Sequence, residues 1–233
     1  QHNVILLEDV CESMGSKCKE KYLGTFGLAS FFSMYFGHHL STIEGGFINT
    51  NDENLYHALL MMRSHGWTRD LPIEKKNEYK SKYEIDDFTE LYNFYLPGFN
   101  LRSTDLQAFI GLRAIDKLDN YSNIRNKNFL HYITNIKNNE LNIRVDNDNF
   151  ISSFAMPIIS KNKKQIVSNL LENGIECRPL IAGDLSNKPI WYETYGEVYL
   201  HNCRLIDKYG FYIPNHQDLT EEELNKIIEI IND

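Results

Sequence analysis

Positive charge, long apolar runs and closely spaced cysteines are all scarce in this sequence. The 233 residues carry 24 lysines and arginines against 32 aspartates and glutamates, a net charge of -8 at pH 7. A basic stripe for a nucleic-acid backbone is therefore not expected. No run approaches the roughly 20 apolar residues of a membrane helix, and the start lacks the charged-then-apolar layout of a signal peptide. We expect a cytoplasmic protein that binds neither nucleic acid nor membrane.

The cysteines give no sign of a metal site or a disulfide framework. No Cys-x-x-Cys pair occurs, and no cysteine lies between Cys18 and Cys177. This spacing argues against zinc knuckles and structural disulfides and favours isolated, buried thiols. We therefore predict no metal. The four cysteines are Cys11, Cys18, Cys177 and Cys203.

The chain does have enough apolar material for a sizeable core. Hydrophobic residues make up 42% and aromatic residues 12%, which suffices for one large or two smaller domains. In the first part, strand-like and helix-like segments alternate, the pattern of an α/β fold. The run at 4–9 is typical of a strand buried on both faces, with Asp9 at its carboxyl end. We further predict strands at 29–37 and 45–50, and a helix at 53–66 capped by Asn51 or Asp52.

The remainder alternates in the same way after a polar excursion. Residues 67–96 are charged and tyrosine-rich with weak periodicity, so we expect only partial order there. A long helix follows a capping box of Thr104 and Gln107, and the last helix follows one of Thr220 and Glu223. Between these helices we predict a strand at 152–159, a helix at 161–174 and a strand at 175–181.

Polar residues gather where the predicted strands end. Asp9 ends the first strand, and Ser33 lies in the second, which runs into the turn His38–Gly46. Open α/β sheets bind ligands beyond the carboxyl ends of their strands, so a site is expected here. The segments "RSHG" (63–66) and "GFNLR" (98–102) follow in the sequence.

In this order the motifs resemble the DegT/DnrJ/EryC1/StrS family of sugar aminotransferases, fold type I enzymes that use pyridoxal phosphate. The resemblance covers essentially the whole chain but only the C-terminal part of the family, so the chain looks like a fragment. It implies an α/β fold, with a three-layer large-domain remnant and a small α+β C-terminal domain. We assign 1–115 to a partial large cofactor-binding domain, 116–145 to a bridging helix and 146–233 to the small domain.

The resemblance implies three cofactor contacts. Asp9 matches the carboxylate that keeps the pyridinium nitrogen protonated, and Ser33 matches a serine that contacts the cofactor phosphate. Asn100 matches a residue that reaches across a homodimer to the phosphate of the second cofactor. Taken alone, Asp9 also fits a plain turn or cap residue, and the segment around Asn100 fits a turn before a capped helix.

At the family's lysine position, counted back from Glu44, this chain has His38. An imidazole cannot form the covalent Schiff base that a lysine forms, but it can act as a general base near neutral pH. The resemblance to the histidine-containing branch implies loss of the C3 hydroxyl from a nucleotide-linked 4-keto-6-deoxyhexose, with pyridoxamine phosphate as cofactor. An amino donor such as glutamate restores that cofactor, and the pathway is deoxysugar and polysaccharide biosynthesis. Two adjacent histidines alone also fit a surface turn or an accidental metal site.

Further residues are assigned by the same resemblance. Glu12, where many family aminotransferases have glutamine, is expected to orient His38 or stabilise its charge. We expect substrate binding by His65, Arg102 and Arg178, with Arg178 gripping the diphosphate. Arg178 also fits an ordinary surface ion pair.

A related branch of these dehydratases carries an iron–sulfur cluster, for which this chain lacks cysteines between Cys18 and Cys177. The cluster-free type is therefore favoured. Two alternatives stay open. One is a nucleotide-sugar transaminase with a lysine from elsewhere, against which stands the lack of lysine between Lys21 and Lys75. The other is a catalytically inactive truncated fragment.

Overall fold

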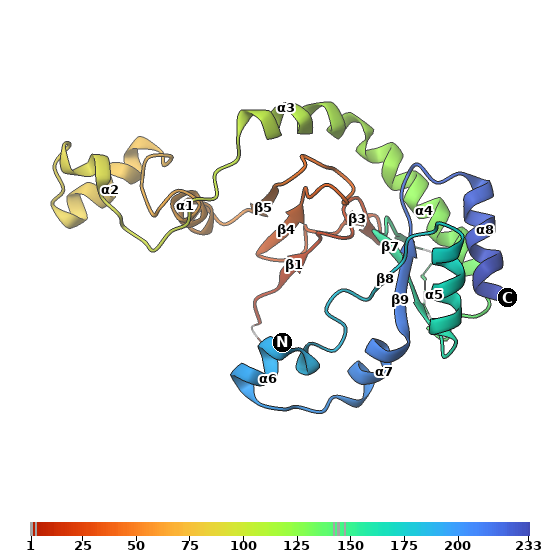
Figure 1. Cartoon of the computed structure of the whole chain (residues 1–233). Coiled ribbons are helices and arrows are strands. Elements are labelled where there is room, and N and C mark those ends of the chain that lie inside the picture. The colour runs from red at the N-terminus through yellow and green to blue at the C-terminus, as the bar shows by residue number, and fades with distance from the viewer. Residues whose placement is uncertain (1, 3, 142, 144, 147) are drawn as a thin grey trace. The chain divides into compact units, whose positions relative to one another are not determined.

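The computed structural model describes residues 2, 4–141, 143, 145–146 and 148–233 (Figure 1). The chain forms two compact units. The first unit consists of Gln1–Cys11 and Gly24–Ile115, and the second of Glu12–Leu23 and Asp116–Asp233. The fold is mixed α/β, as the sequence predicts. None of the described helices is long and apolar enough to cross a membrane.

A three-stranded sheet organises the first unit, in the order β1-β4-β5. Strands β1 (Leu7–Asp9) and β4 (Ala29–Ser33) run parallel, whereas β4 and β5 (Gly46–Thr50) run antiparallel. Aromatic residues in β4 (Phe31, Phe32) and aromatic and β-branched residues in β5 (Phe47, Ile48, Thr50) favour these strands. The prediction that 4–9 forms a strand buried on both faces was wrong. The strand begins at Leu7, and Val4 is 81% exposed, because the described residues place no covering layer over this segment.

Glu8 ties β1 to the loop that precedes β4. Its carboxylate accepts hydrogen bonds from the N–H groups of Gly24 (2.6 Å), Phe26 (2.6 Å) and Gly27 (2.7 Å). Gly27 is required because a Cβ there would lie 2.5 Å from the carbonyl oxygen of Leu6. This anchoring fixes the start of β4 beside β1 and so sets where the two strands end.

The helices of the first unit begin largely where their caps predict. Asp52 caps α1 (Glu53–Met62) by accepting from the N–H of Leu55 over 2.7 Å. Thr104 and Gln107 form the expected capping box of α3 (Asp105–Ala114). The range 67–96, for which only partial order was expected, contains α2 (Ile73–Tyr83) and the 3₁₀ helix η1 (Thr89–Tyr92), neither of which was predicted. Helix α2 has no fully buried residue, so it lacks the apolar stripe by which helices are recognised.

The second unit contains two three-stranded antiparallel sheets. One has the order β3-β2-β6, from Lys21–Tyr22, Lys17–Cys18 and Asn149–Phe150. The other has the order β7-β9-β8, from Ala155–Ile159, Gly210–Pro214 and Arg178–Pro179. The strands predicted at 152–159 and 175–181 are confirmed but shorter. Strand β9 was not predicted.

Helices cover the β7-β9-β8 sheet and enclose the main core. A short 3₁₀ helix, η2 (Ile115–Lys117), leads from α3 into α4, and residues 142 and 144 of the predicted bridging range lie outside the described residues. Side chains of α4, α5 and α8 pack with β7 and β9 around Tyr132, Ile158, Leu170 and Ile213, all fully buried. Thr220 and Glu223 form the predicted capping box of α8. The helices are α4 (Leu118–Asn135), α5 (Lys163–Glu172), η3 (Leu185–Asn187), α6 (Pro189–Tyr195), α7 (His201–Tyr209) and α8 (Glu221–Asn232).

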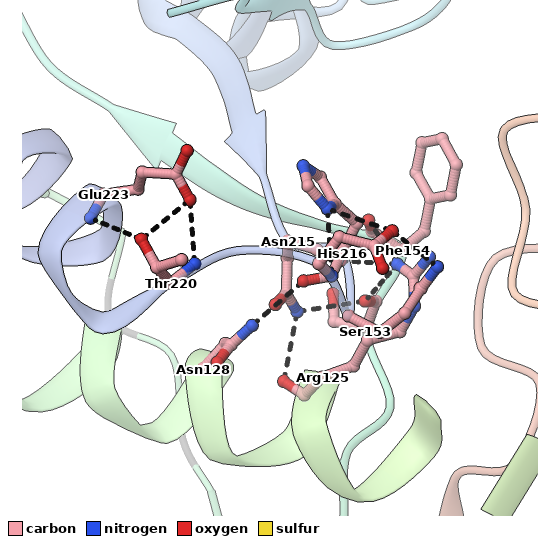
Figure 2. A network of polar contacts seen from close by, with 10 residues as sticks. Arg125, Asn128, Ser153, Phe154, Asn215, His216, Thr220 and Glu223 are labelled. Atoms are coloured by element: carbon pink, nitrogen blue, oxygen red, sulfur yellow. Dashed lines mark hydrogen bonds and ion pairs between the residues drawn. The ribbon is translucent and has the colours of Figure 1, made fainter. Parts of the chain in front are cut away.

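A buried arginine holds α4 against the ends of β7 and β9 (Figure 2). Arg125 is 2% exposed and donates through Nη1 to the carbonyl oxygens of Phe154 (3.1 Å), Ser153 and Asn215. Burial lowers the pKa of Arg125 to about 10. The side-chain amide of Asn128, one turn further along the helix, donates to the carbonyl oxygen of His216 over 3.1 Å. These bonds pair main-chain carbonyl groups that burial would otherwise leave unsatisfied.

The cysteines are less buried than the sequence predicts. All four are half-buried rather than fully buried, and they form no disulfide among the residues that the structure describes. Burial raises the pKa of the Cys177 thiol, and the negative charge of Glu176 adds to this.

Candidate active site

Three residues of the first unit are joined by hydrogen bonds where β1 ends. Nδ1 of His38 lies 2.6 Å from the carbonyl oxygen of Cys11. The N–H of Cys11 donates to Oδ1 of Asp9 over 3.1 Å. Hydrogen bonds from the side chain and the main chain of Cys11 hold the pKa of Asp9 below its ordinary value, and the charge of His38 lowers it further. Asp9 is therefore a carboxylate at neutral pH, next to the imidazole.

The turn that carries His38 is closed at its base by main-chain hydrogen bonds. Met34 N–H donates to the carbonyl oxygen of Gly45, and Thr42 N–H donates to that of Met34, both over 2.9 Å. Gly45 has φ +146°, and a Cβ there would lie 2.7 Å from Oγ1 of Thr42. A Cβ at Gly46 would lie 2.8 Å from the carbonyl oxygen of Phe32. The two glycines are thus needed for the chain to fold back from the turn into β5.

Helix α3 also supports this turn. The side-chain amide of Gln107 donates to the carbonyl oxygen of Glu44 over 2.7 Å, while its Oε1 accepts from Thr104 N–H over 2.8 Å in the capping box. The sequence predicted the capping box, but it did not predict that Gln107 also donates to Glu44. The contact with Glu44 joins residues 63 positions apart, and no local pattern reports it.

Ser33 is the last residue of β4, directly before the His38 turn. Its Oγ accepts from the N–H of Tyr35 over 3.2 Å. In the parallel pair of strands Asp9 stands opposite Phe31, two residues from Ser33. Asp9 and Ser33 therefore lie at the same end of the sheet, and His38 lies in the turn that follows it. This is the end beyond which open α/β sheets bind ligands.

His65 and Asn100 lie in two segments that pair with each other. Ser64 and Asn100 form an antiparallel bridge, and His65 N–H donates to the carbonyl oxygen of Phe99 over 2.7 Å. Close approach requires Gly66, where a Cβ would lie 1.8 Å from the carbonyl oxygen of Leu96. The His65 ring is half-buried, with its centroid 4.6 Å from that of Trp67. Asn100 and the nearby Arg102 are exposed.

The structure assigns Glu12 and Arg178 to the second unit. Both side chains are exposed, and Arg178 forms an ion pair with Glu176. An exposed pair of this kind contributes little to stability. The main-chain carbonyl oxygen of Glu12 accepts from Phe154 N–H over 3.0 Å. Because His38 belongs to the first unit, the expected action of Glu12 on His38 stays a prediction.

A mostly apolar cavity of about 350 Å³ in the second unit adjoins Glu12. Tyr212 of β9 forms part of its lining. Tyr212 pairs with Arg178 between β9 and β8 and lines the same cavity as Glu12. Burial is the main cause that raises the pKa of Tyr212. Sequence analysis missed Tyr212 because strand β9 itself was not predicted. The lining residues are Glu12, Ser153, Phe154, Ala155, Pro157, Leu180, Ile181 and Tyr212.

The donor set of the first unit fits a pyridoxamine phosphate cofactor. The lowered pKa of Asp9 leaves a carboxylate, which suits a protonated pyridinium nitrogen. The hydroxyl of Ser33 is able to donate to a phosphate oxygen. His38 has no primary amine for covalent attachment.

The chain belongs to the DegT/DnrJ/EryC1/StrS aminotransferase family, whose model matches residues 1–232. Two curated relatives, from Escherichia coli O55:H7 and Yersinia pseudotuberculosis, are 38% and 37% identical to it over 98% of this chain. Each is named GDP-4-keto-6-deoxy-D-mannose 3-dehydratase. The chain spans only 61% and 60% of the lengths of these relatives.

Solved structures of GDP-4-keto-6-deoxymannose 3-dehydratase are similar to the whole described fold. One with bound GDP-perosamine and one of the E. coli enzyme with bound hydrated PLP each have a TM-score of 0.85 and 36% identity. A third contains a trapped PLP-glutamate geminal diamine and has a TM-score of 0.84 at 35% identity. Each match covers 99% of this chain and 61% of the other chain. The relatives thus bind PLP, a GDP-sugar and a PLP-glutamate adduct.

Proposed function

We propose that the protein removes the C3 hydroxyl from a GDP-linked 4-keto-6-deoxyhexose, in the biosynthesis of a deoxysugar for polysaccharide. The observation that carries the proposal is the hydrogen bond of His38 to Cys11, which is in turn hydrogen-bonded to the carboxylate of Asp9. The sequence resemblance, which assigns His38 to the family's lysine position, supports it. Similarity to two dehydratases at 37–38% identity supports the same reaction. The GDP-linked substrate and glutamate as amino donor are proposed from what those relatives and structures bind.

In this proposal the first unit holds the cofactor. Asp9 pairs with the pyridinium nitrogen, Ser33 contacts the phosphate, and Asn100 reaches the phosphate in the second site of a homodimer. Pyridoxamine phosphate, when bound, supplies a primary amine and a ring that accepts electrons. The lowered pKa of Asp9 serves this role, because a carboxylate stabilises the positive charge on the ring nitrogen.

His38 acts as the general base that removes a proton and as the acid that returns one. An imidazole can both accept and donate a proton, which suits both steps. Glu12 stabilises the imidazolium form. His65, Arg102 and Arg178 bind the substrate, and the exposed guanidinium of Arg178 offers paired N–H donors to the diphosphate.

The runner-up is a nucleotide-sugar transaminase, which the family's name as aminotransferases favours. It requires a lysine to hold the cofactor covalently, and none lies between Lys21 and Lys75. A catalytically inactive fragment is the third reading, because the chain spans about 60% of its relatives. Cofactor binding without turnover by the protein that contains this chain would favour that third reading.

Replacement of the base tests the proposal. His38→Asn keeps a side-chain N–H but no basic nitrogen, so we expect cofactor binding to persist while turnover falls by roughly 10² to 10⁴. His201→Asn is the matched control, because His201 is an exposed histidine of α7. The proposal fails if both variants retain the unaltered rate. His38→Lys should gain covalent cofactor attachment and shift the products towards transamination.

A further inference from the structure

The main chain of Cys11 is hydrogen-bonded to the side chains of both Asp9 and His38. Its N–H donates to Oδ1 of Asp9 over 3.1 Å, and its carbonyl oxygen lies 2.6 Å from Nδ1 of His38. The first hydrogen bond joins the main-chain N–H of Cys11 to the carboxylate, and the second joins its carbonyl oxygen to the imidazole. One peptide segment therefore sets the position of both side chains.

The carbonyl partner decides where the imidazole proton lies. A carbonyl oxygen only accepts hydrogen bonds, so Nδ1 of His38 must carry the hydrogen of this contact. In the neutral ring the other nitrogen, Nε2, then holds the lone pair. In the protonated ring both nitrogens carry hydrogen, and loss of the Nε2 proton restores the same tautomer. Proton exchange thus occurs at Nε2 in either direction.

Both ends of this contact are held by the main chain. Val10, directly before Cys11, is 2% exposed, and its N–H donates to the carbonyl oxygen of Phe31 over 2.9 Å. On the other side the N–H of His38 donates to the carbonyl oxygen of Tyr35 over 3.0 Å, and the Tyr35 ring lies edge-on, 6.1 Å from the imidazole. The short Nδ1 contact therefore joins two fixed points.

We propose that the main-chain carbonyl of Cys11 fixes His38 in the Nδ1–H tautomer, so that Nε2 is the atom that takes and returns the proton. Cys11 is thereby a positioning residue, which links the imidazole to the carboxylate of Asp9. The catalytic meaning of Nε2 rests on the proposed function, whereas the tautomer itself does not. The lowered pKa of Asp9 agrees with this arrangement, because an imidazolium beside it is favourable.

Nitrogen-15 NMR of the histidine side chains tests the tautomer without any assay of activity. The protein that contains this chain is labelled at histidine with nitrogen-15 and measured well above pH 6.5, the ordinary histidine pKa. The signal that disappears in His38→Asn is assigned to His38, and His38→Gln gives the same assignment should the first variant fail to fold. We expect Nδ1 of His38 to carry the proton and Nε2 to be unprotonated. The opposite tautomer, or averaging between both, overturns the proposal.

Variants of Cys11 separate the main chain from the thiol. Cys11→Ala and Cys11→Ser both keep the carbonyl group, so each should leave the His38 tautomer unchanged. A tautomer that switches in folded Cys11→Ala would show that the thiol, not the carbonyl, fixes the ring, and would contradict the proposal. These outcomes stand apart from the proposed function, since a protein without dehydratase activity can still show the Nδ1–H tautomer.

Discussion

Arg125 and Asn215 hydrogen-bond to each other in both directions. Nη1 of Arg125 donates to the carbonyl oxygen of Asn215, and the side-chain amide of Asn215 donates to the carbonyl oxygen of Arg125 over 3.2 Å. The same amide also donates to the carbonyl oxygen of Ser153 over 3.0 Å. The pair therefore links α4 to the segments that precede β7 and follow β9.

Arg125→Met should destabilise the second unit by about 1 to 3 kcal/mol, because it leaves buried carbonyl oxygens without a donor. Methionine nearly fills the space of the arginine stem, so the loss reports hydrogen bonds rather than a cavity. Lys127→Met is the control, since Lys127 is exposed on the same helix. Urea unfolding measures both. Equal midpoints for the two variants would contradict the assigned role of Arg125.

The pKa of Asp9 should depend on the Cys11 side chain. When folding lowers the pKa of a carboxyl group, the ionised group stabilises the folded state at pH values above the pKa that it has in the unfolded chain. This contribution is lost as the pH falls through the lower pKa that the group has in the folded state. Cys11→Ala removes the side-chain hydrogen bond, so the pKa of Asp9 should rise and the loss should occur at higher pH. Cys11→Ser, which keeps a donor, should change it less. Carbon-13 NMR titration of the Asp9 carboxyl would refute this dependence if all three proteins gave one pKa.

The cofactor should be held without a covalent bond, because His38 has no primary amine. Borohydride reduction of the cofactor-loaded protein, followed by mass spectrometry, should leave every lysine unmodified. His38→Lys is the positive control and should gain one reduced cofactor adduct. An adduct on any lysine of the unaltered protein would favour the transaminase.

The active site should be shared across a homodimer, as proposed for Asn100. In a mixture of His38→Asn and Asn100→Ala subunits, half of the dimers are mixed, and each of these regains one intact site. Random mixing should therefore restore about a quarter of the unaltered activity. Two separately prepared samples of His38→Asn, mixed in the same way, give the background. Mixed dimers no more active than that background would argue against a shared site.

The sequence predicted those elements whose signals are local. Asp52 and the two capping boxes mark helix starts through side chains within three residues of the bonds they form. Helix α2 was missed because it has no fully buried residue to set a periodicity. Strand β9 was missed because it is stabilised by pairing with β7, and paired residues of the two strands lie 51 or more positions apart in the sequence.

The same distinction between local signals and long-range contacts applies to the candidate site. Asp9 was proposed from its position at a strand end, where α/β sheets bind ligands, and the roles of Ser33 and His38 were assigned from the family resemblance. These assignments stay predictions. The role proposed for Cys11 has no signal in the sequence, because its contact with His38 uses a main-chain carbonyl that every residue type possesses. The placement of Glu12 in the second unit also has no local signal.

Product analysis tests the central claim most directly. The protein that contains this chain is given GDP-4-keto-6-deoxymannose, pyridoxal phosphate and glutamate, and the sugar product is identified by NMR and mass spectrometry. We predict a 4-keto sugar that has lost its C3 hydroxyl, formed together with 2-oxoglutarate and ammonia. A 4-amino sugar that retains the C3 hydroxyl as the main product would contradict the dehydratase and establish the transaminase in its place.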